Sequence, residues 1–471
     1  MPREFRGVWV ATVDNINWPS RPGLPTAQQQ HELRGIIRAA ARARCNAIVL
    51  QVRPACDALY ASSLDPWSEY LSGAIGRPPT PAWDPLSAAI DEAHACGLEL
   101  HAWVNPFRAR HRTNRTPPSS DHVVRRRPEW VRAYGPELWL DPGEAEARQY
   151  VLAVARDLVR RYDLDGLHLD DYFYPYPAKD ASGRPLTFPD HETFQRYRAA
   201  GGTLARADWR RANVDTFVEQ LYRTVKDEKP WVRVGISPFG IWRPGNPRGV
   251  VGLDAYHALS ADARRWLAEG WIDYLAPQLY WRLDATGQRF EDLLDWWLAQ
   301  NALGRHVWPG LNASRVLEAG PQRWPATEIV AQIEAVRRRP NADGHLLYHA
   351  DAALGAASPL NSTLSSLYRG PALAPASPWL HGPSALRRPP TLSASQRWPT
   401  GDLVLEWRSD EPPPRFWLLR WRSRGRWLAL VLGGHSHTHA LPARDAPAPD
   451  MLSLCAVDHV GRLGPAVVAV P

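Results

Sequence analysis

The chain is poor in lysine, methionine and cysteine, and its hydrophobic residues form no long run. Only Lys179, Lys226 and Lys229 are lysines, so arginine carries nearly all of the positive charge behind the net charge of +7. An arginine bias beside 45 prolines can reflect coding composition as much as function. Net charge speaks to solubility and to attraction of anions. Because no recognised nucleic-acid-binding module accompanies it, no nucleic-acid partner is predicted.

The four cysteines predict neither a disulfide nor a metal site. They are Cys45, Cys56, Cys96 and Cys455, and no two of them form a Cys-x-x-Cys pair. His435, His437 and His439 alternate and could share one strand face, but no cysteine or carboxylate completes a ligand set nearby, so an exposed turn is favoured. We therefore predict no metal and no cofactor.

No membrane span or signal peptide is predicted for the chain as given. No run of 18 apolar residues occurs, which excludes a typical transmembrane helix. Residues 1–6 also lack an apolar stretch behind a positive start.

What the sequence does contain is a repeated strand-then-helix unit. Strands are predicted at 5–11, 46–52, 98–104, 166–170, 232–237, 274–278, 307–311 and 345–348, each followed by a segment with helical spacing of apolar residues. This count favours an α/β fold, a closed (β/α)8 TIM barrel over residues 1–370. A Pro-rich linker at 371–390 and a small fibronectin type III-like β-sandwich at 391–471, with short alternating strands, complete the prediction.

The connections are long on one side only. Helix-to-strand turns are short, whereas the strand-to-helix loops 53–83, 105–141, 171–208 and 238–260 are long. Length gathered on one rim of a barrel is typical of an active-site face.

The stretch 165–175 carries the most informative pattern. In a strand, alternate side chains face opposite sides, so His168 and Asp170 point into the barrel while Leu167 and Leu169 pack outward. An inward carboxylate followed by aromatics is what a sugar-cleaving barrel places at a strand end. Asp171 points the other way in a regular strand and reaches the site only if the backbone turns.

Other strand ends add polar and aromatic residues. They are Trp9, Asp14 and Asn17 after the first strand, Gln51, Arg53 and Asp57 at the second, His101, Trp103 and Asn105 along the third, and Gln278, Tyr280 and Trp281 at the sixth.

Seven stretches together resemble the bacterial glycosyl-hydrolase-like barrel family (glycosyl hydrolase-like 10). They are 6–12, 51–60, 97–106, 165–175, 209–213, 235–242 and 273–281. The best-described member of that family is a division-site hydrolase of peptidoglycan strands that lack stem peptides.

The resemblance implies glycoside hydrolysis by paired carboxyl groups, without a cofactor, in the cell envelope, periplasmic or exported. The implied partners are peptidoglycan or a related glycan and, by family, cell-division or envelope proteins. Asp170 is the first choice for the nucleophile or charge-stabilising group. The general acid stays open among Asp171, Asp57 and Asp14, in that order.

The remaining candidates are substrate-binding. Arg53, His101 and Asn105 are predicted to bond sugar groups or to hold the aspartates ionised. Trp103, Tyr172, Tyr174, Trp242, Tyr280 and Trp281 are either sugar platforms or loop packing. The arginines of the loop after the third strand, among them Arg108 and Arg132, form a basic rim that would attract the lactyl carboxylates of peptidoglycan.

Two alternatives remain open at this point. The chain has Asn17 where the family usually has Asp, and its fifth strand carries no carboxylate. A glycan-binding protein that no longer hydrolyses, or a glycosidase for another polysaccharide, fits these departures.

Overall fold

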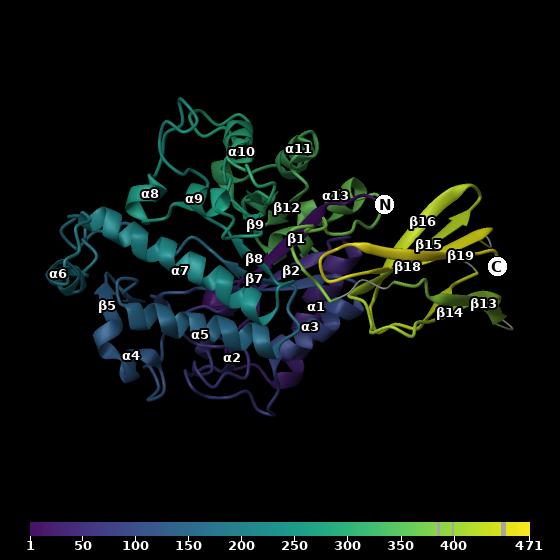
Figure 1. The fold of residues 1–471 in the computed structure, drawn as a ribbon, viewed down its shortest axis with the longest axis horizontal. Coiled ribbons are helices and arrows are strands. Elements are labelled where there is room, and N and C mark those ends of the chain that lie inside the picture. Colours follow the sequence, from purple (N-terminus) through teal and green to yellow (C-terminus); the bar gives the residue numbers. More distant parts are fainter. Residues whose placement is uncertain (384–386, 398–399, 444–448) are drawn as a thin grey trace.

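The computed structural model describes residues 1–383, 387–397, 400–443 and 449–471. Figure 1 shows a barrel of strands wrapped by helices, with a smaller β-module against one end and the loops around α4 and α6 toward the other.

A closed parallel barrel forms the larger part of the chain. Hydrogen bonding orders nine strands within residues 1–383 as β10-β9-β8-β7-β3-β2-β1-β12-β11, with every listed neighbour parallel. The two outermost strands of this row, β10 and β11, are consecutive pieces of one stretch of chain, so the sheet closes on itself. The strands are β1 (Phe5–Val10), β2 (Ala47–Arg53), β3 (Glu99–Val104), β7 (Gly166–Leu169), β8 (Arg233–Ile236), β9 (Tyr274–Leu275), β10 (His306–Val307), β11 (Gly310–Leu311) and β12 (Gly344–Leu347).

The seventh predicted strand is thus split in two. Pro309 has no N–H to donate to a ladder, which interrupts the strand between β10 and β11. Its carbonyl still accepts from the Leu346 N–H at 3.0 Å. With this one interruption, the structure confirms the predicted (β/α)8 barrel.

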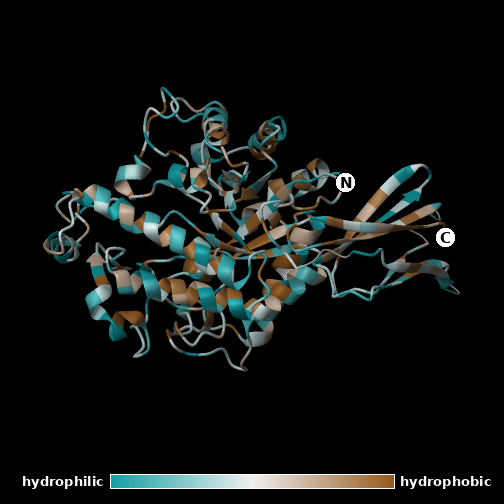
Figure 2. Cartoon of the chain, viewed as in Figure 1, coloured by the Kyte–Doolittle hydropathy of each residue, from teal (hydrophilic) through white to brown (hydrophobic). Residues whose placement is uncertain are grey.

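A ring of helices covers the strands. The helices are α1 (Thr26–Arg42), α3 (Pro85–Ala95), α5 (Ala145–Arg161), α7 (Arg206–Glu228), α9 (Ala263–Ala268), α10 (Phe290–Ala299), α11 (Ala326–Arg337) and α13 (Pro359–Leu367). Figure 2 shows hydrophobic residues gathered on the central strands and hydrophilic ones on much of the helical surface. The outward strand residues, such as Leu167 and Leu169, belong to the core between sheet and helices. The barrel interior has its own aromatic core, with Phe5, Trp9 and Trp308 among its members.

The long strand-to-helix loops hold the smaller elements. These are α2 (Glu69–Ser72), α4 (Val123–Arg126), α6 (His191–Ala199), α8 (Ala255–Ala258), α12 (Ala350–Leu354), the hairpin-like sheet of β4 (Arg108–Arg110), β6 (Glu137–Leu140) and β5 (Val131–Tyr134), and the short 3-10 turns η1 (Val13–Asn15), η2 (Pro128–Trp130), η3 (Ala313–Val316) and η4 (Gly320–Gln322).

The C-terminal module consists, in its described part, of two antiparallel sheets. One has the order β13-β14-β17 and the other β16-β15-β18-β19. The strands are β13 (Thr391–Arg397), β14 (Asp402–Arg408), β15 (Phe416–Ser423), β16 (Arg426–Gly433), β17 (Thr438–Leu441), β18 (Met451–Val457) and β19 (Leu463–Ala469). Trp407 of the first sheet packs against Trp417 of the second in a shared core. The closer likeness to fibronectin type III stays a prediction.

The module is docked on the base of the barrel. Part of the predicted linker packs there, with Leu373 and Ser377 buried. Arg415, just before β15, pairs with Asp163 through Nη1 at 2.6 Å and Nη2 at 2.7 Å, and its Nε lies 2.9 Å from Asp165. The Arg415 side chain is only 4% exposed.

Removing Arg415 is expected to destabilise the protein strongly. Arg415→Ala leaves the buried Asp165 carboxylate without its cation, and breaking such a pair typically costs about 3–5 kcal/mol. The first unfolding transition, followed by calorimetry, should shift to lower temperature. The exposed Arg408→Ala is the matched control, and equal shifts for both variants would contradict the docking contact.

Candidate active site

Asp170 lies directly after β7, at the end of the barrel where the long loops gather. It is 4% exposed. Its Oδ2 accepts a hydrogen bond from Trp103 Nε1 at 3.1 Å and another from Asn105 Nδ2. Both donors come from the end of the adjacent strand β3, which pairs with β7. The structure therefore brings these three predicted residues together.

A line of side-chain amides sets the orientation of Asn105. Gln51 Oε1 accepts from the backbone N–H groups of Thr12 and Val13, each at 2.9 Å. Gln51 Nε2 must then be the group that donates to Asn105 Oδ1, at 2.6 Å. Asn105 is left with Nδ2 facing Asp170, so this position presents a donor to the carboxylate.

Asp171 also reaches the site. Because β7 ends at Leu169, strand alternation no longer governs the two aspartates. The Tyr176 hydroxyl donates to Asp171 Oδ2, and the residue is 3% exposed. Burial raises the pKa of Tyr280, and the charges of Asp171 and Asp170 raise it further.

Both carboxyl groups favour their protonated form more than exposed ones do. Burial raises the pKa of Asp170 to about 7, with a further contribution from the charge of Asp171 and an opposing one from Arg108. Burial likewise raises the pKa of Asp171. Two neighbouring buried carboxylates repel, so the pair titrates as a unit and retains a proton near neutral pH. Glycoside hydrolysis requires one protonated carboxyl group beside one carboxylate, and a pair that retains one proton has this composition.

Beneath the pair, a chain of buried hydrogen bonds runs into the barrel. Trp9 Nε1, which can only donate, donates to His168 Nε2 at 3.1 Å. His168 is therefore neutral with its proton on Nδ1, and it donates to the Tyr274 hydroxyl at 3.0 Å. Burial lowers the pKa of His168, which agrees with the neutral form.

The chain continues in one direction to the base. The Tyr274 hydroxyl donates to His101 Nδ1 at 2.9 Å, and His101 Nε2 donates to Glu99 at 3.1 Å. Glu99 also pairs with Arg233 at 2.8 Å. His101 and His168 are both fully buried, as their inward position predicts, but His101 lies within this chain and below the mouth.

Several predicted substrate-binding residues surround the pair. Asn17 Nδ2 donates to His349 Nδ1 at 2.7 Å, after the last barrel strand. Tyr172 lies under the Arg108 guanidinium, 5.1 Å from its ring centroid. Gln278 Nε2 donates to the Ser237 carbonyl at 3.1 Å, and Gln278 partly offsets the burial that raises the pKa of Asp171. Tyr280 and Trp281, which follow β9, stack on Tyr348 and meet the edge of Phe239, respectively.

Other predicted residues lie elsewhere. The Arg53 guanidinium is fully buried and paired with Asp65 at 2.7 Å. Trp242 stacks on Trp296 of α10 and donates to Asp262.

Three more predicted residues also stand apart from the pair. Asp57 is buried in the loop after β2, where burial raises its pKa to about 6. Tyr174 is buried against Phe188. Asp14 is exposed on the rim and lines a small hollow of about 210 Å³ with Arg21 and Arg115.

Sequence reasoning missed three tyrosines of the site. Tyr274 and Gln278 are four positions apart in the sixth predicted strand, so they share one face. The inward position of Tyr274 could therefore have been predicted from the sequence. Tyr348 ends the eighth predicted strand, and burial raises its pKa, with further contributions from the charges of both aspartates. Tyr176 lies in an irregular loop, and no pattern marks it as the partner of Asp171.

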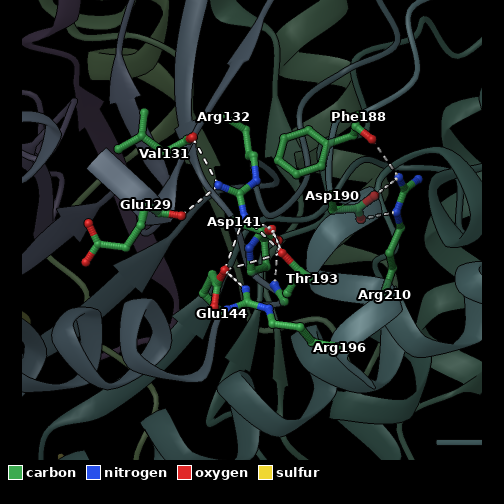
Figure 3. A network of polar contacts seen from close by, with 12 residues as sticks. Glu129, Val131, Arg132, Asp141, Glu144, Phe188, Asp190, Thr193, Arg196 and Arg210 are labelled. Atoms are coloured by element: carbon green, nitrogen blue, oxygen red, sulfur yellow. Dashed lines mark hydrogen bonds and ion pairs between the residues drawn. The ribbon is translucent and has the colours of Figure 1, made fainter. Parts of the chain in front are cut away.

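A polar network holds the loop that follows the two aspartates (Figure 3). Thr193 of α6 donates to Asp141 Oδ2 at 2.6 Å, and Arg132 pairs with the same carboxylate at 3.1 Å. In the same loop, the fully buried Asp190 binds Arg206 and Arg210 of α7. These contacts fix segment 171–208 against β5 and α7. Arg132, which was predicted to belong to the basic rim, is bound within this network.

Within the described ranges, histidine, cysteine and acidic side chains do not gather in the groups of three that would hold a metal ion. A closed barrel with buried, proton-sharing carboxyl groups and tryptophans at its mouth is the arrangement of a carbohydrate-active barrel protein.

Comparison with known proteins gives the family. The model of the family described as "Glycosyl hydrolase-like 10" matches residues 4–323, so the chain belongs to that family. It is 41% identical over 302 residues to "Glycosyl hydrolase YngK" of Bacillus subtilis, covering 63% of this chain and 58% of the relative. It is 36% identical over 315 residues to "Glycosyl hydrolase DigH" of Escherichia coli, covering 62% and 69%, respectively. The match thus spans less than two thirds of YngK.

Solved structures show the same fold. The glycoside hydrolase domain of PgaB (BpsB) from Bordetella bronchiseptica has a TM-score of 0.51 and 15% identity, covering 78% of this chain and 98% of that one. The catalytic domain of β-amylase from Paenibacillus polymyxa has a TM-score of 0.51 and 12% identity, with the same coverage.

Asp170→Asn is expected to stabilise the fold, increasingly so as pH rises. The folded carboxyl keeps its proton to about pH 7, against an ordinary value of 3.8, so the folded chain binds the extra proton between these values. The contribution of Asp170 to the free energy of unfolding therefore falls as pH rises through that window. An asparagine does not titrate, so the variant avoids this loss. Denaturant unfolding should show little difference at pH 4 and a gain on the order of 3 kcal/mol at pH 8.

The exposed Asp91→Asn on α3 is the matched control and should change stability little at either pH. A pH-independent effect of Asp170→Asn would refute the raised pKa.

Proposed function

We propose that the protein is an endo-acting glycoside hydrolase that cuts peptidoglycan glycan strands, preferentially those lacking stem peptides. The observation that carries the proposal is the buried Asp170–Asp171 pair, whose raised pKa values supply one acid and one carboxylate at the same place. The family membership and the two relatives called glycosyl hydrolases support the reaction class.

The contacts of the pair suggest its division of labour. Asp170 accepts two N–H donors on Oδ2 and the Tyr172 backbone N–H at 3.4 Å on Oδ1, and these donors favour the carboxylate. It is assigned the nucleophilic or charge-stabilising role. Asp171 is assigned the general acid, with Tyr176 as its hydrogen-bond partner. Asp57 and Asp14 remain lesser candidates for the acid, because neither carries a contact to Asp170 among the described residues.

The substrate class rests on charge at the mouth. Arg108 lies near both aspartates, and the exposed Arg21 and Arg115 line the rim hollow. Glycan strands without stem peptides expose a lactyl carboxylate on every second sugar, which these cations would attract. A neutral chitin oligomer lacks this attraction. Asp170 and Asp171 are 4% and 3% exposed, so only a small part of either residue is open to solvent.

We place the protein in the cell envelope, where this substrate lies, with division or envelope proteins as its partners. The structure adds one finding on membranes: in the described ranges, every helix is too short or too polar to span a bilayer.

Asp170→Asn should abolish product release from purified glycan strands lacking stem peptides while binding persists. Loss of the reacting carboxylate is expected to lower turnover by about a thousandfold or more. Product release is measured by chromatography and binding by calorimetry, with Asp91→Asn as control and chitin oligomers as the neutral substrate. Turnover that survives in Asp170→Asn refutes the assignment, and binding without turnover in the parent chain points to the glycan-binding alternative.

The pH profile should lose activity toward alkaline pH, because Asp171, whose pKa burial raises, then gives up the proton that it must donate. The Tyr176 hydroxyl lowers the pKa of Asp171, so Tyr176→Phe should move this alkaline limb to higher pH. Tyr174→Phe is the matched control, since its buried hydroxyl has no hydrogen-bond partner in the described structure. Equal limbs for the two variants would count against Asp171 as the acid.

A further inference from the structure

A second hollow lies at the opposite end of the barrel from the aspartate pair. It has a volume of about 730 Å³ and is lined by the C-terminal end of α1, by segment 369–372 and by strands β15 and β16 of the module. We call it the base groove. It lies where two structural units meet, a preferred location for ligand sites.

The charge of the base groove has one sign. Of the described residues, its lining includes five arginines and neither aspartate nor glutamate; the five are Arg42, Arg44, Arg369, Arg420 and Arg426. The whole chain has 56 basic and 49 acidic residues, so a random patch would hold both signs.

Most of these cations are uncommitted. In the described part of the chain, the side chains of Arg42, Arg369 and Arg426 make no hydrogen bond or ion pair. Arg420 Nε is buried without a partner, although Nη2 donates to Ser453 Oγ at 3.2 Å. Guanidinium groups left free in a groove favour a ligand that carries carboxylate or similar anions.

An exposed tryptophan stands beside these cations. Trp427 is 49% exposed, and the Arg420 guanidinium lies 5.9 Å from its ring centroid. Strand pairing puts Trp427 opposite Arg422 and Arg420 opposite Ala429, so Trp427 and Arg420 share the sheet face turned to the groove. A flat apolar ring beside fixed positive charges suits a sugar ring that bears an acidic substituent.

We propose that the base groove binds a second stretch of carboxylated glycan, with Trp427 stacking on a sugar ring and Arg42, Arg369 and Arg426 pairing with its carboxylates. The site is non-catalytic and goes beyond the proposed hydrolysis. Only the choice of probe rests on the proposed function, because binding here needs no turnover. Occupancy at both ends would hold the enzyme on a multi-stranded polymer between cuts.

The test uses the full-length Asp170→Asn chain and a purified peptidoglycan glycan oligomer with free lactyl carboxylates. Calorimetry should resolve two binding sites, and hydroxyl-radical footprinting should show protection of Trp427. The triple variant Arg42→Gln/Arg369→Gln/Arg426→Gln should weaken one site by about tenfold, as should Trp427→Ala. The control triple Arg388→Gln/Arg397→Gln/Arg408→Gln removes the same charge from residues of the linker and module outside the groove and should leave both sites unchanged.

Three outcomes overturn the proposal. They are a single binding site that the groove variants do not alter, equal groove affinity for the oligomer after its carboxylates are reduced to alcohols, and equal or tighter groove binding of single-stranded DNA of matched charge. Failure of the proposed hydrolysis is recognised separately, since the parent chain would then release no product while Trp427 is still protected.

Discussion

The interior of the barrel depends on the rule that a polar group without water must find a partner. Trp9 can only donate and the Glu99 carboxylate can only accept. His168, Tyr274 and His101 lie between them, so each must donate one hydrogen bond toward Glu99. This order keeps His168 neutral. The His168 ring also meets Trp103 edge-on at 6.5 Å, and Trp103 in turn donates to Asp170. The hydrogen-bonded interior thereby orients the indole N–H that donates to Asp170.

The aspartate pair works against the stability that this interior provides. Burying two adjacent carboxyl groups raises their pKa and costs free energy at neutral pH, where exposed groups would ionise freely. The donors on Asp170 and Asp171 recover part of that cost, but they do not return either group to its ordinary pKa. Such a perturbed pair, held by a rigid barrel, is typical of sites where proton transfer is required.

Much of the fold was predictable because strand and helix periods are local properties. The eight units and the long loops on one rim follow from them, and so does the meeting of Asp170, Trp103 and Asn105 at the ends of paired strands. Loop residues were not predictable in the same way. Arg53 pairs with Asp65 of the loop after β2 and does not join the site, and the path of segment 171–208 depends on Asp190 binding two arginines of α7. Asp65 and Asp190 lie in loops outside the regular helices and strands, so no periodic pattern predicts their partners.

The docked module contacts the strand that ends at Asp170. Asp165, which Arg415 of the module contacts, immediately precedes β7, and Asp170 immediately follows it. A strand of four residues is only about 13 Å long, and its backbone is stiff. Asp165 further accepts from the Leu100 N–H at 2.8 Å, which fixes β7 against β3. Because β3 also supplies Trp103 and Asn105, the carboxylate that binds the module also bonds to the strand that carries both donors of Asp170.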